Sequence, residues 1–385
     1  MIHIDLQNPH TDWSETASYV ADVILKGGIA VLPTETVYGL AARAADENAL
    51  RKLIQIKGRS ENHPFALAFS CSEAVADFCG ELSPLACRFA RRTLPGPVSL
   101  VLDVSQNENE LYRLPEFVQQ HVTKKNTGEN PSVCCRVPGH PFTQTVLGSM
   151  LNERGLNKNG GEPVILTSAN RSGNGESVSI EQILADLSGT AIAVADGILT
   201  APKPSTVLKV SGSQYTILRE GSISAATINR LAATVLLFVC TGNICRSPMA
   251  ECLCESILAS QQGCGIDELE RLGYAVLSAG ISCNSGNPAS ADAVAVMKEY
   301  GLDLSGHQSQ RLTQQAVQFA DFIYVMTREH REWILSQWHN ADSRLQVLRT
   351  DGGDVPDPYG SSIETYRHCG ELIKREIIKR AAEIV

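Results

Sequence analysis

Short apolar runs alternate with amphipathic segments along the first two hundred residues of the chain. Residues 27–32 form an apolar, β-rich run that Pro33 ends, and residues 46–57 carry apolar side chains at near-helical spacing. The same reading predicts further strands at 65–69, 98–102, 133–137, 164–167 and 206–210, and helices at 84–92 and 180–187. This mixture is typical of an α/β domain.

A new alternation of strands and helices begins near Val235. It predicts strands at 235–239, 274–278 and 322–326 and helices at 248–258 and 289–300, the order of a doubly wound parallel sheet. At 385 residues the chain exceeds the roughly 250–300 at which a single core stops growing. We therefore expect two domains, residues 1–232 and 233–385, with a long flexible excursion at the polar residues 103–131.

Composition indicates the cellular compartment and the classes of partner that this protein can have. The 12 cysteines are spread through the chain without zinc-type spacing, which favours reduced thiols in a cytosolic protein. The first residues lack a secretory signal, and no apolar run approaches the roughly 18 residues of a membrane span, so we expect a cytoplasmic protein without membrane contact. A net charge of −9 argues against general coating of nucleic acid but leaves room for a local basic groove.

The segment "FVCTGNICRSP", residues 238–248, has the composition of an anion site. An apolar strand leads into a short loop and then into a helix, for which Ser247 suits the N-cap and Pro248 the first helical position. Backbone N–H groups that curl inward at a helix N-terminus bind phosphate, and Gly242 would permit the tight curl.

Within this segment a thiol and a cation stand six positions apart, at Cys240 and Arg246. The field that attracts phosphate also favours a thiolate, which can attack phosphorus while the arginine fork holds two phosphate oxygens and Ser247 assists the departing thiolate. A small buried cysteine at a strand end is the plainer alternative. For the acid that such chemistry needs, Asp357 in "VPDPYG" is the best candidate, Asp354 its competitor, and a simple Asp-Pro turn the alternative.

Residues 235–385 resemble the low-molecular-weight protein tyrosine phosphatases, in "VLLFVCTGNICRSPMAE", "SAG", "GLDLSGHQSQRL" and "DPYG". The resemblance implies a four-stranded parallel sheet with helices on both faces, Cys240 as nucleophile, Arg246 as phosphate clamp and Asp357 as acid. It also implies a phosphate-binding loop made of Thr241, Gly242, Asn243, Ile244, Cys245 and Ser247, with His307 as a further support. In relatives, a cysteine placed like Cys245 forms a reversible disulfide with the nucleophile, which is our hypothesis here.

The substrate of this second domain stays open between two classes. Phosphotyrosine proteins or small phosphomonoesters are one, and similar bacterial enzymes that act on phosphoarginine are the other. Those arginine phosphatases carry a threonine where this chain has Ile244. Because an aliphatic wall suits an aromatic ring better than a guanidinium, we favour phosphotyrosine.

The first domain lacks a Walker-type phosphate loop, but three clusters of polar residues stand at the ends of predicted strands and helices. They are "LPTETVYGL" after a strand, "KGR" at 57–59 after a helix and "LTSANRSG" at 166–173 after another strand. Taken singly these are a solvated loop, a helix C-terminus and a capping turn. Together they supply two cations and short hydrogen-bonding side chains that could surround a triphosphate and a small polar acid.

Residues 10–231 resemble the YrdC-like threonylcarbamoyl-AMP synthases, in "GGIAVLPTETVYGLAARA", "KGRSENHPFAL", "LPGPVSLVL", "VCCRVPGHP", "ILTSANRSG", "PSTVLKV" and "ILREGSIS". The resemblance implies a twisted open mixed sheet, and condensation of L-threonine, bicarbonate and ATP, with Mg²⁺ and no prosthetic group, for N6-threonylcarbamoyladenosine at tRNA position 37. It implies ATP-binding residues Lys57, Arg59, His63, Ser132, Ser168, Asn170 and Arg219, and threonine-binding residues Thr36, Arg136, Thr167 and Ser205.

Some positions depart from that family's pattern. His63 replaces an asparagine, Ala68 replaces a histidine that can touch threonine, and "PGPVS" stands where "PGPLT" is usual. A second hypothesis therefore treats the first domain as an RNA-binding or nucleotide-binding regulatory module on a working phosphatase. Under the first hypothesis the partners include tRNA or the transferase complex that modifies it. Neither hypothesis expects a metal held by protein side chains.

Overall fold

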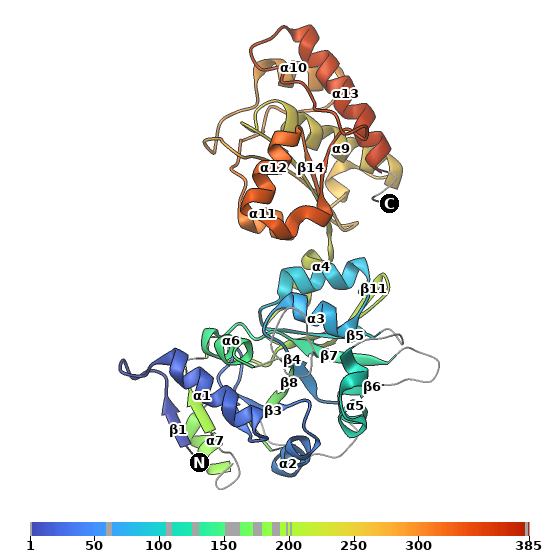
Figure 1. The fold of residues 1–385 in the computed structure, drawn as a ribbon. Helices are drawn as coiled ribbons and strands as arrows, with labels where there is room; N and C mark the ends of the chain where they lie inside the picture. Colours follow the sequence, from blue (N-terminus) through green and yellow to red (C-terminus); the bar gives the residue numbers. More distant parts are fainter. Residues whose placement is uncertain are drawn as a thin grey trace. The chain divides into compact units, whose positions relative to one another are not determined.

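The computed structural model describes residues 2–58, 64–104, 110–124, 131–150, 162–171, 179–186, 193–197, 199–200, 202–381 and 384. The chain divides into two compact units, Met1–Ile228 and Asn229–Val385 (Figure 1). The division falls within helix α8 (Ala225–Ala232), close to the boundary expected after residue 232. Each unit has its own sheet, and each is described by itself.

The first unit is built on one mixed sheet of 11 strands within the described residues. Its main path runs β1-β9-β2-β3-β8-β4-β7-β5-β10-β11, and β6 pairs with β7. The strands are β1 (Ile2–Asp5), β2 (Ala30–Leu32), β3 (Gly39–Arg43), β4 (Ala66–Ala68), β5 (Val98–Asp103), β6 (Thr123–Lys124), β7 (Ser132–Arg136), β8 (Val164–Ser168), β9 (Ala193–Asp196), β10 (Thr206–Ser211) and β11 (Gln214–Arg219).

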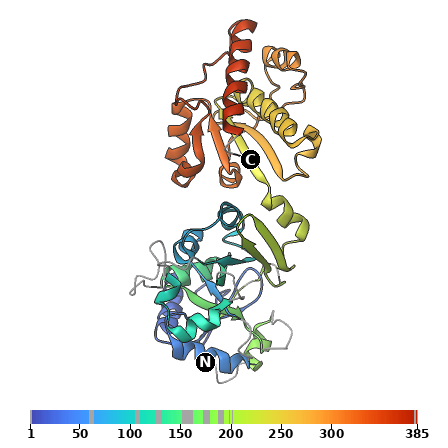
Figure 2. The same cartoon turned by 90° about the vertical axis from the view of Figure 1, so that its right-hand side faces the viewer.

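Helices cover this sheet, and the apolar spacing of their sequences explains why. Helix α1 (Trp13–Leu25) is capped by Asp12 and buries Ala17, Val20, Ala21 and Ile24 against a core shared with α6 (Pro141–Gly148). The other helices are α2 (Glu47–Lys57), α3 (Ser72–Cys79), α4 (Pro84–Thr93), α5 (Glu116–Val122) and α7 (Ile180–Asp186). Figure 2 shows the helices packed around the strands of this unit.

Residues 103–131 were expected to form a long flexible excursion, and this expectation is wrong for the part that the structure describes. A 3₁₀ turn at Glu110–Arg113, helix α5 and strand β6 occupy it. Leu111, Leu114, Val118 and Val122 are all buried. The spacing of these four apolar residues is that of one helical face. The polar residues on either side of them led to the incorrect prediction of a flexible segment.

The second unit contains a four-stranded parallel sheet in the order β13-β12-β14-β15. Its strands are β12 (Thr234–Cys240), β13 (Tyr274–Gly280), β14 (Phe322–Val325) and β15 (Leu345–Val347). Side chains of β12 alternate between two cores. Leu236 and Phe238 enter the core with α9 (Arg246–Gln262), α10 (Ala291–Glu299) and α13 (Ile363–Ala381), whereas Leu237 and Val239 enter the core with α11 (Gln314–Phe319) and α12 (Arg328–Gln337). Helices therefore cover both faces, as expected of a doubly wound sheet.

The helix that follows β12 begins earlier than expected. Its N-cap is Cys245, so Ser247 and Pro248 lie inside the first turn instead of at the N-cap and first position. Ser247 serves a different purpose, because its hydroxyl is buried and bonded within the loop. In the described part of the chain, no helix combines the length and the apolar character needed to cross a membrane.

Candidate functional sites

The phosphate-loop sequence of the second unit forms a compact turn between β12 and α9. Cys240, the last residue of β12, is 3% exposed. Asn243 has a left-handed backbone with φ of 53°, and Gly242 does not, so the expectation that Gly242 makes the tight curl is wrong. Asparagine tolerates this conformation because its short amide can bond locally. At the end of β13, a Cβ on Gly280 would lie 2.6 Å from Thr241 O, so only glycine allows β13 to pass this close to the loop.

Hydrogen bonds converge on the sulfur of Cys240. The backbone N–H of Asn243 donates to Sγ at 3.2 Å, and Ser247 Oγ lies 3.0 Å from Sγ. The Asn243 amide donates to Ser247 Oγ at 2.9 Å, so the Ser247 hydrogen is left to donate, with the sulfur much closer than the other acceptor, Ala279 O at 3.4 Å. Two donors aimed at sulfur stabilise a thiolate.

Asn243 connects this centre to buried groups that sequence reasoning missed. Its amide also donates to Ser278 Oγ at 2.8 Å, and Ser278 in turn donates to Glu251 Oε2 at 2.5 Å. Burial raises the pKa of Glu251, and the hydrogen bond from Ser278 opposes that rise. Asn243 Oδ1 accepts the backbone N–H of Gln310, and Asn243 O lies 2.8 Å from His307 Nε2. The structure thus brings Asn243, Ser247 and His307 together, as expected.

Arg246 and Asp357 meet at the mouth of the loop. Arg246 is 5% exposed, donates from Nη1 to Val355 O at 3.2 Å, and pairs through Nη2 with Asp357 Oδ2 at 2.5 Å. The Asp357 side chain is 51% exposed, so it faces both the guanidinium and solvent. Asp354, the competing acid, instead accepts the backbone N–H of Arg328 at 2.9 Å. Of the two acids, only Asp357 lies on the phosphate-clamping arginine.

The remaining loop residues have separate surroundings. Cys245 is buried, and its sulfur lies 3.2 Å from both Ser290 Oγ and Tyr366 OH. Burial raises the pKa of the Cys245 thiol, and its hydrogen bonds with Ser290 and Tyr366 oppose this. Ile244 is partly buried and packs against the adjacent core, and Thr241 Oγ1 lies 2.9 Å from His330 Nε2.

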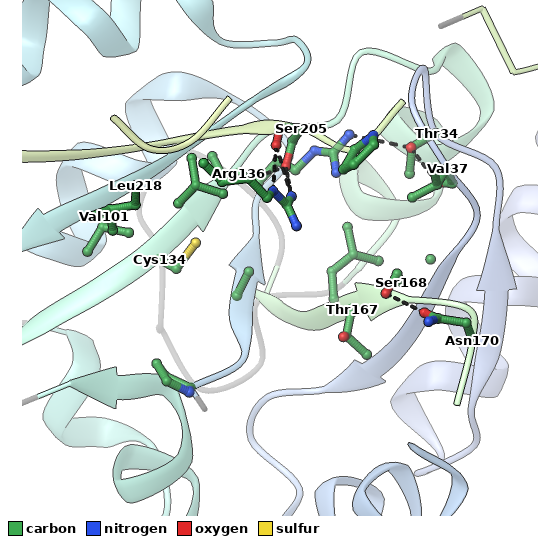
Figure 3. Close-up of a pocket in the computed structure, with 18 of the residues that line it drawn as sticks. Thr34, Val37, Val101, Cys134, Arg136, Thr167, Ser168, Asn170, Ser205 and Leu218 are labelled. Atoms are coloured by element: carbon green, nitrogen blue, oxygen red, sulfur yellow. Dashed lines mark hydrogen bonds between the residues drawn. The ribbon is translucent and has the colours of Figure 1, made fainter. Parts of the chain in front are cut away.

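The first unit contains a pocket of about 670 Å³ that opens between β3, β8, β7 and β10 (Figure 3). Most of the residues that the sequence assigned to ATP and threonine line it. From the ATP set these are Lys57, Ser132, Ser168, Asn170 and Arg219, and from the threonine set Arg136, Thr167 and Ser205. Arg59 and His63 lie outside the described residues. Thr36 is fully buried just behind this lining.

Lys57 holds one end of the pocket together. Its ammonium donates to the carbonyls of Ser168 at 2.8 Å and Asn170 at 2.6 Å, with Asn170 Oδ1 at 3.2 Å. Ser168 Oγ donates to Asn170 Oδ1 at 2.6 Å. The last residue of α2 is thereby fastened to the turn after β8, which brings Lys57 of the "KGR" cluster to the "TSAN" cluster. A buried lysine requires such acceptors to be tolerated.

Arg136, a second cation of the lining, has a partner that sequence reasoning missed. Its Nη2 donates to Thr36 Oγ1 at 2.6 Å and to Glu35 Oε1 at 2.8 Å. The second oxygen of Glu35 accepts the backbone N–H of Gly139 at 2.7 Å. Arg136 lines the pocket and is already held by Glu35 and Thr36, so its guanidinium is fixed where it can meet a carboxylate.

Arg219, also in the lining, donates from Nε and Nη2 to the carbonyl of Ser205, and Ser205 Oγ lies 2.9 Å from Ser99 Oγ. Beside Arg219 the wall becomes apolar, with Val101, Cys134 and Leu218 labelled in Figure 3. The pocket therefore combines the cations Lys57, Arg136 and Arg219 with an apolar flank, which accommodates a nucleotide and a small zwitterion. Ala68, where the family pattern has histidine, is fully buried in a core that includes Phe142 and Val164.

Comparison with known proteins matches both halves of the chain. The Sua5/YciO/YrdC family model, described as telomere recombination, matches residues 22–221, and the low molecular weight phosphotyrosine protein phosphatase model matches residues 235–385. A threonylcarbamoyl-AMP synthase from Pyrococcus abyssi is 29% identical over 216 residues, which are 56% of this chain and 56% of that protein. The chain thus spans little more than half of that relative.

The relatives of the second half differ in their stated substrates. A probable low molecular weight protein-tyrosine-phosphatase, EpsP, from Ralstonia nicotianae is 37% identical over 37% of this chain and 90% of that protein. A protein-arginine-phosphatase from Geobacillus stearothermophilus is 35% identical over 38% of this chain and 93% of that protein.

Solved structures similar to the chain include a YwlE mutant from Bacillus subtilis, 32% identical, covering 40% of this chain and 99% of that one with a TM-score of 0.35. YciO from E. coli is 21% identical and covers 57% of this chain and 94% of that one, with a TM-score of 0.45. The family matches extend over nearly the whole of each unit. The chain therefore belongs to the Sua5/YciO/YrdC family in its first half and to the low molecular weight phosphotyrosine protein phosphatase family in its second half.

Proposed function

We propose that the second unit hydrolyses phosphomonoesters with Cys240 as nucleophile. The observation that carries this proposal is the pair of donors on the Cys240 sulfur, from the Asn243 N–H and Ser247. The thiolate attacks phosphorus, the bond to the leaving oxygen breaks, and Asp357 gives that oxygen its proton. Water then attacks the phosphorus of the phosphocysteine and Asp357 takes one proton from the water. The sulfur–phosphorus bond breaks, so the Cys240 thiolate is regenerated and inorganic phosphate is released.

For this cycle Arg246 must exchange partners. In the structure its Nη2 holds Asp357, and a bound phosphate would offer two oxygens to the same fork. Phosphate binding therefore releases the Asp357 side chain, which faces the leaving group in its protonated form as the acid. Because the Asp357 side chain is half exposed, this exchange needs no rearrangement of the core.

Phosphotyrosine is the substrate class that Ile244 favours, and phosphoarginine is the second candidate because an arginine phosphatase is among the relatives. Kinetics of the full chain on matched phosphotyrosine and phosphoarginine peptides decide between them. We expect a higher kcat/KM on phosphotyrosine, and Ile244→Thr should shift the ratio toward phosphoarginine. A higher kcat/KM of the unaltered chain on phosphoarginine would reverse the assignment.

For the first unit we propose synthesis of L-threonylcarbamoyladenylate. The threonine amine and bicarbonate give a carbamate with loss of water, and the carbamate oxygen attacks the α-phosphate of ATP and displaces pyrophosphate. The observation that carries this proposal is a single pocket lined by both Lys57 and Arg136. Arg136 suits the threonine carboxylate, and cations with Mg²⁺ on the phosphates would neutralise the leaving pyrophosphate.

Pyrophosphate release by the full chain with ATP, bicarbonate and Mg²⁺, with and without threonine, tests this proposal. We expect threonine-dependent release that Arg136→Leu abolishes. Nucleotide or RNA binding without such release would instead favour the regulatory module on a phosphatase. The product is proposed to serve a tRNA-modifying transferase complex in the cytoplasm, and transfer of threonylcarbamate to tRNA in a reconstituted reaction is the check.

A further inference from the structure

His330 is a buried histidine beside the phosphate loop for which the reaction above has no role. It lies in the first turn of α12 and is 4% exposed. Its Nε2 is 2.9 Å from Thr241 Oγ1, and its Nδ1 is 3.0 Å from Thr327 Oγ1. Both ring nitrogens are therefore committed, one to the residue after the nucleophile and the other to the N-cap of α12.

The ring is held neutral. Burial lowers the pKa of His330 to about 4, the charge of Arg246 acts in the same direction, and Asp357 and Asp354 oppose it. A neutral imidazole has one donor and one acceptor nitrogen. Since Thr327 Oγ1 already accepts the His330 backbone N–H at 3.2 Å, its own hydrogen suits Nδ1, and Nε2–H then donates to Thr241.

The same turn of α12 also holds the segment that carries the general acid. Asp354 Oδ1 accepts the backbone N–H of Arg328 at 2.9 Å, and the N–H of Val355 donates to Met326 O at 2.8 Å. Arg246 donates to Val355 O from the opposite side. The residues from 326 to 330 thus contact the phosphate loop through one hydrogen bond and the acid segment through two.

We propose that His330 is a positioning residue, which ties the phosphate loop at Thr241 to the N-terminus of α12 and so sets the placement of Asp357 relative to Cys240. This inference rests on the proposed phosphatase function. Without the tie, the loop and the acid segment keep their separate supports but lose the link between them. Loss of the link slows proton donation to the leaving group more than it weakens phosphate binding by Arg246.

The test measures kcat and KM of the full chain on aryl phosphates with rising leaving-group pKa. His330→Leu and Thr241→Val should each lower kcat about fivefold to tenfold, the cost of a buried hydrogen bond, with little change in KM. The loss should grow as the leaving group becomes poorer, since poor leaving groups depend most on the acid. His330→Gln, whose amide can still donate to Thr241, should recover part of the rate.

A double-mutant cycle separates this role from a general effect on folding. Thr241→Val with His330→Leu should lose no more activity than either change alone, because both remove one interaction. Additive losses, or losses equal for all leaving groups, would overturn the inference. Thr241 is exposed, so its variant keeps the test open if the His330 variants unfold. His339→Leu, at an exposed histidine outside the site, is the matched control.

A separate comparison tests the phosphatase function on which this inference rests. If the unaltered chain and Cys240→Ser are equally inactive on every aryl phosphate, the proposed phosphatase function fails. If the unaltered chain is active and depends on Cys240, and the cycle is additive, only the role of His330 fails.

Discussion

At the turn of the phosphate loop, Asn243 combines a φ of 53° with three side-chain hydrogen bonds, to Ser247, Ser278 and Gln310. Asn243→Ala removes all three and leaves buried partners unsatisfied, so we expect a loss of about 2–4 kcal/mol in the free energy of unfolding. Asn243→Gly loses the same bonds but tolerates positive φ, and it should be about 1 kcal/mol more stable than the alanine variant. Denaturant unfolding of both variants checks the difference, and equal stabilities would contradict it.

Cys245 supports a second prediction at the scale of single residues. Its sulfur is held by Ser290 and Tyr366, and burial raises its pKa, so it stays a thiol while Cys240 reacts first with peroxide. If Cys245 then closes a disulfide on the oxidised Cys240, thiol treatment should restore phosphatase activity. Cys245→Ser should make peroxide inactivation irreversible. Cys264→Ser, at a cysteine outside the loop, is the control, and full recovery of the Cys245 variant would refute the hypothesis.

At the scale of elements, the strand, loop and helix around Cys240 were predictable because their signals are contiguous. β12 is an apolar run, and the loop and helix follow without interruption. β3 was missed, since "GLAAR" has no β-branched residue and its strand state comes from antiparallel pairing on both sides, with β2 and β8. Tertiary pairing, absent from local sequence, decided that element.

The residues of the two sites were likewise predictable only where their signals are contiguous in the sequence. Cys240, Arg246 and Ser247 lie in one short segment, so their spacing alone indicated phosphate chemistry. Glu251 and His330 entered the network only through the packing of α9 and α12 against the loop, and no local pattern distinguishes them from other polar residues of helices. For Glu35, the adjacent Thr34 and Thr36 were a signal, but its pairing with Arg136 depends on the fold.

Helix α13 is attached to the rest of the second unit by a buried carboxylate, which makes its docking sensitive to acid. Glu376 accepts the backbone N–H and the hydroxyl of Thr350 and pairs with Lys379. Burial tends to raise the pKa of Glu376, but the hydrogen bonds from Lys379 and Thr350 outweigh it and lower the pKa from 4.5 to about 2. Folding therefore favours the ionised form.

The sign of the pH effect follows from this lowered pKa. The stabilisation is fully present above pH 4.5 and is lost as the pH falls toward about 2, because the unfolded chain takes up the proton first. Glu376→Gln should cost on the order of 1–3 kcal/mol at pH 7 and flatten the decline in stability across that acid range. The measurement is the free energy of unfolding of the second unit in urea, at several pH values between 2 and 7. If this free energy falls with pH as steeply in the variant as in the unaltered chain, the assignment to Glu376 is contradicted.

At the scale of the whole molecule, the described apolar cores stay within one unit each. One core draws on residues from Leu6 to Ala195, and the two cores of the phosphatase unit begin at Val235. The pocket that contains Lys57 is likewise lined only by residues up to 219, whereas the described partners of Cys240 all lie beyond residue 240. The described residues of each site thus belong to one unit.

Because no described site residue is shared, reciprocal variants of the full chain should separate the two activities. Cys240→Ser removes the nucleophile and should lower phosphatase kcat by about a thousandfold or more, while threonine-dependent pyrophosphate release stays within about twofold of the unaltered chain. Lys57→Met releases the turn at Ser168 and Asn170 and should give the opposite pattern, with Lys26→Met at an exposed lysine as the control. If either variant changes the other unit's rate more than about threefold, the units are energetically coupled, and the separation inferred from their cores is wrong.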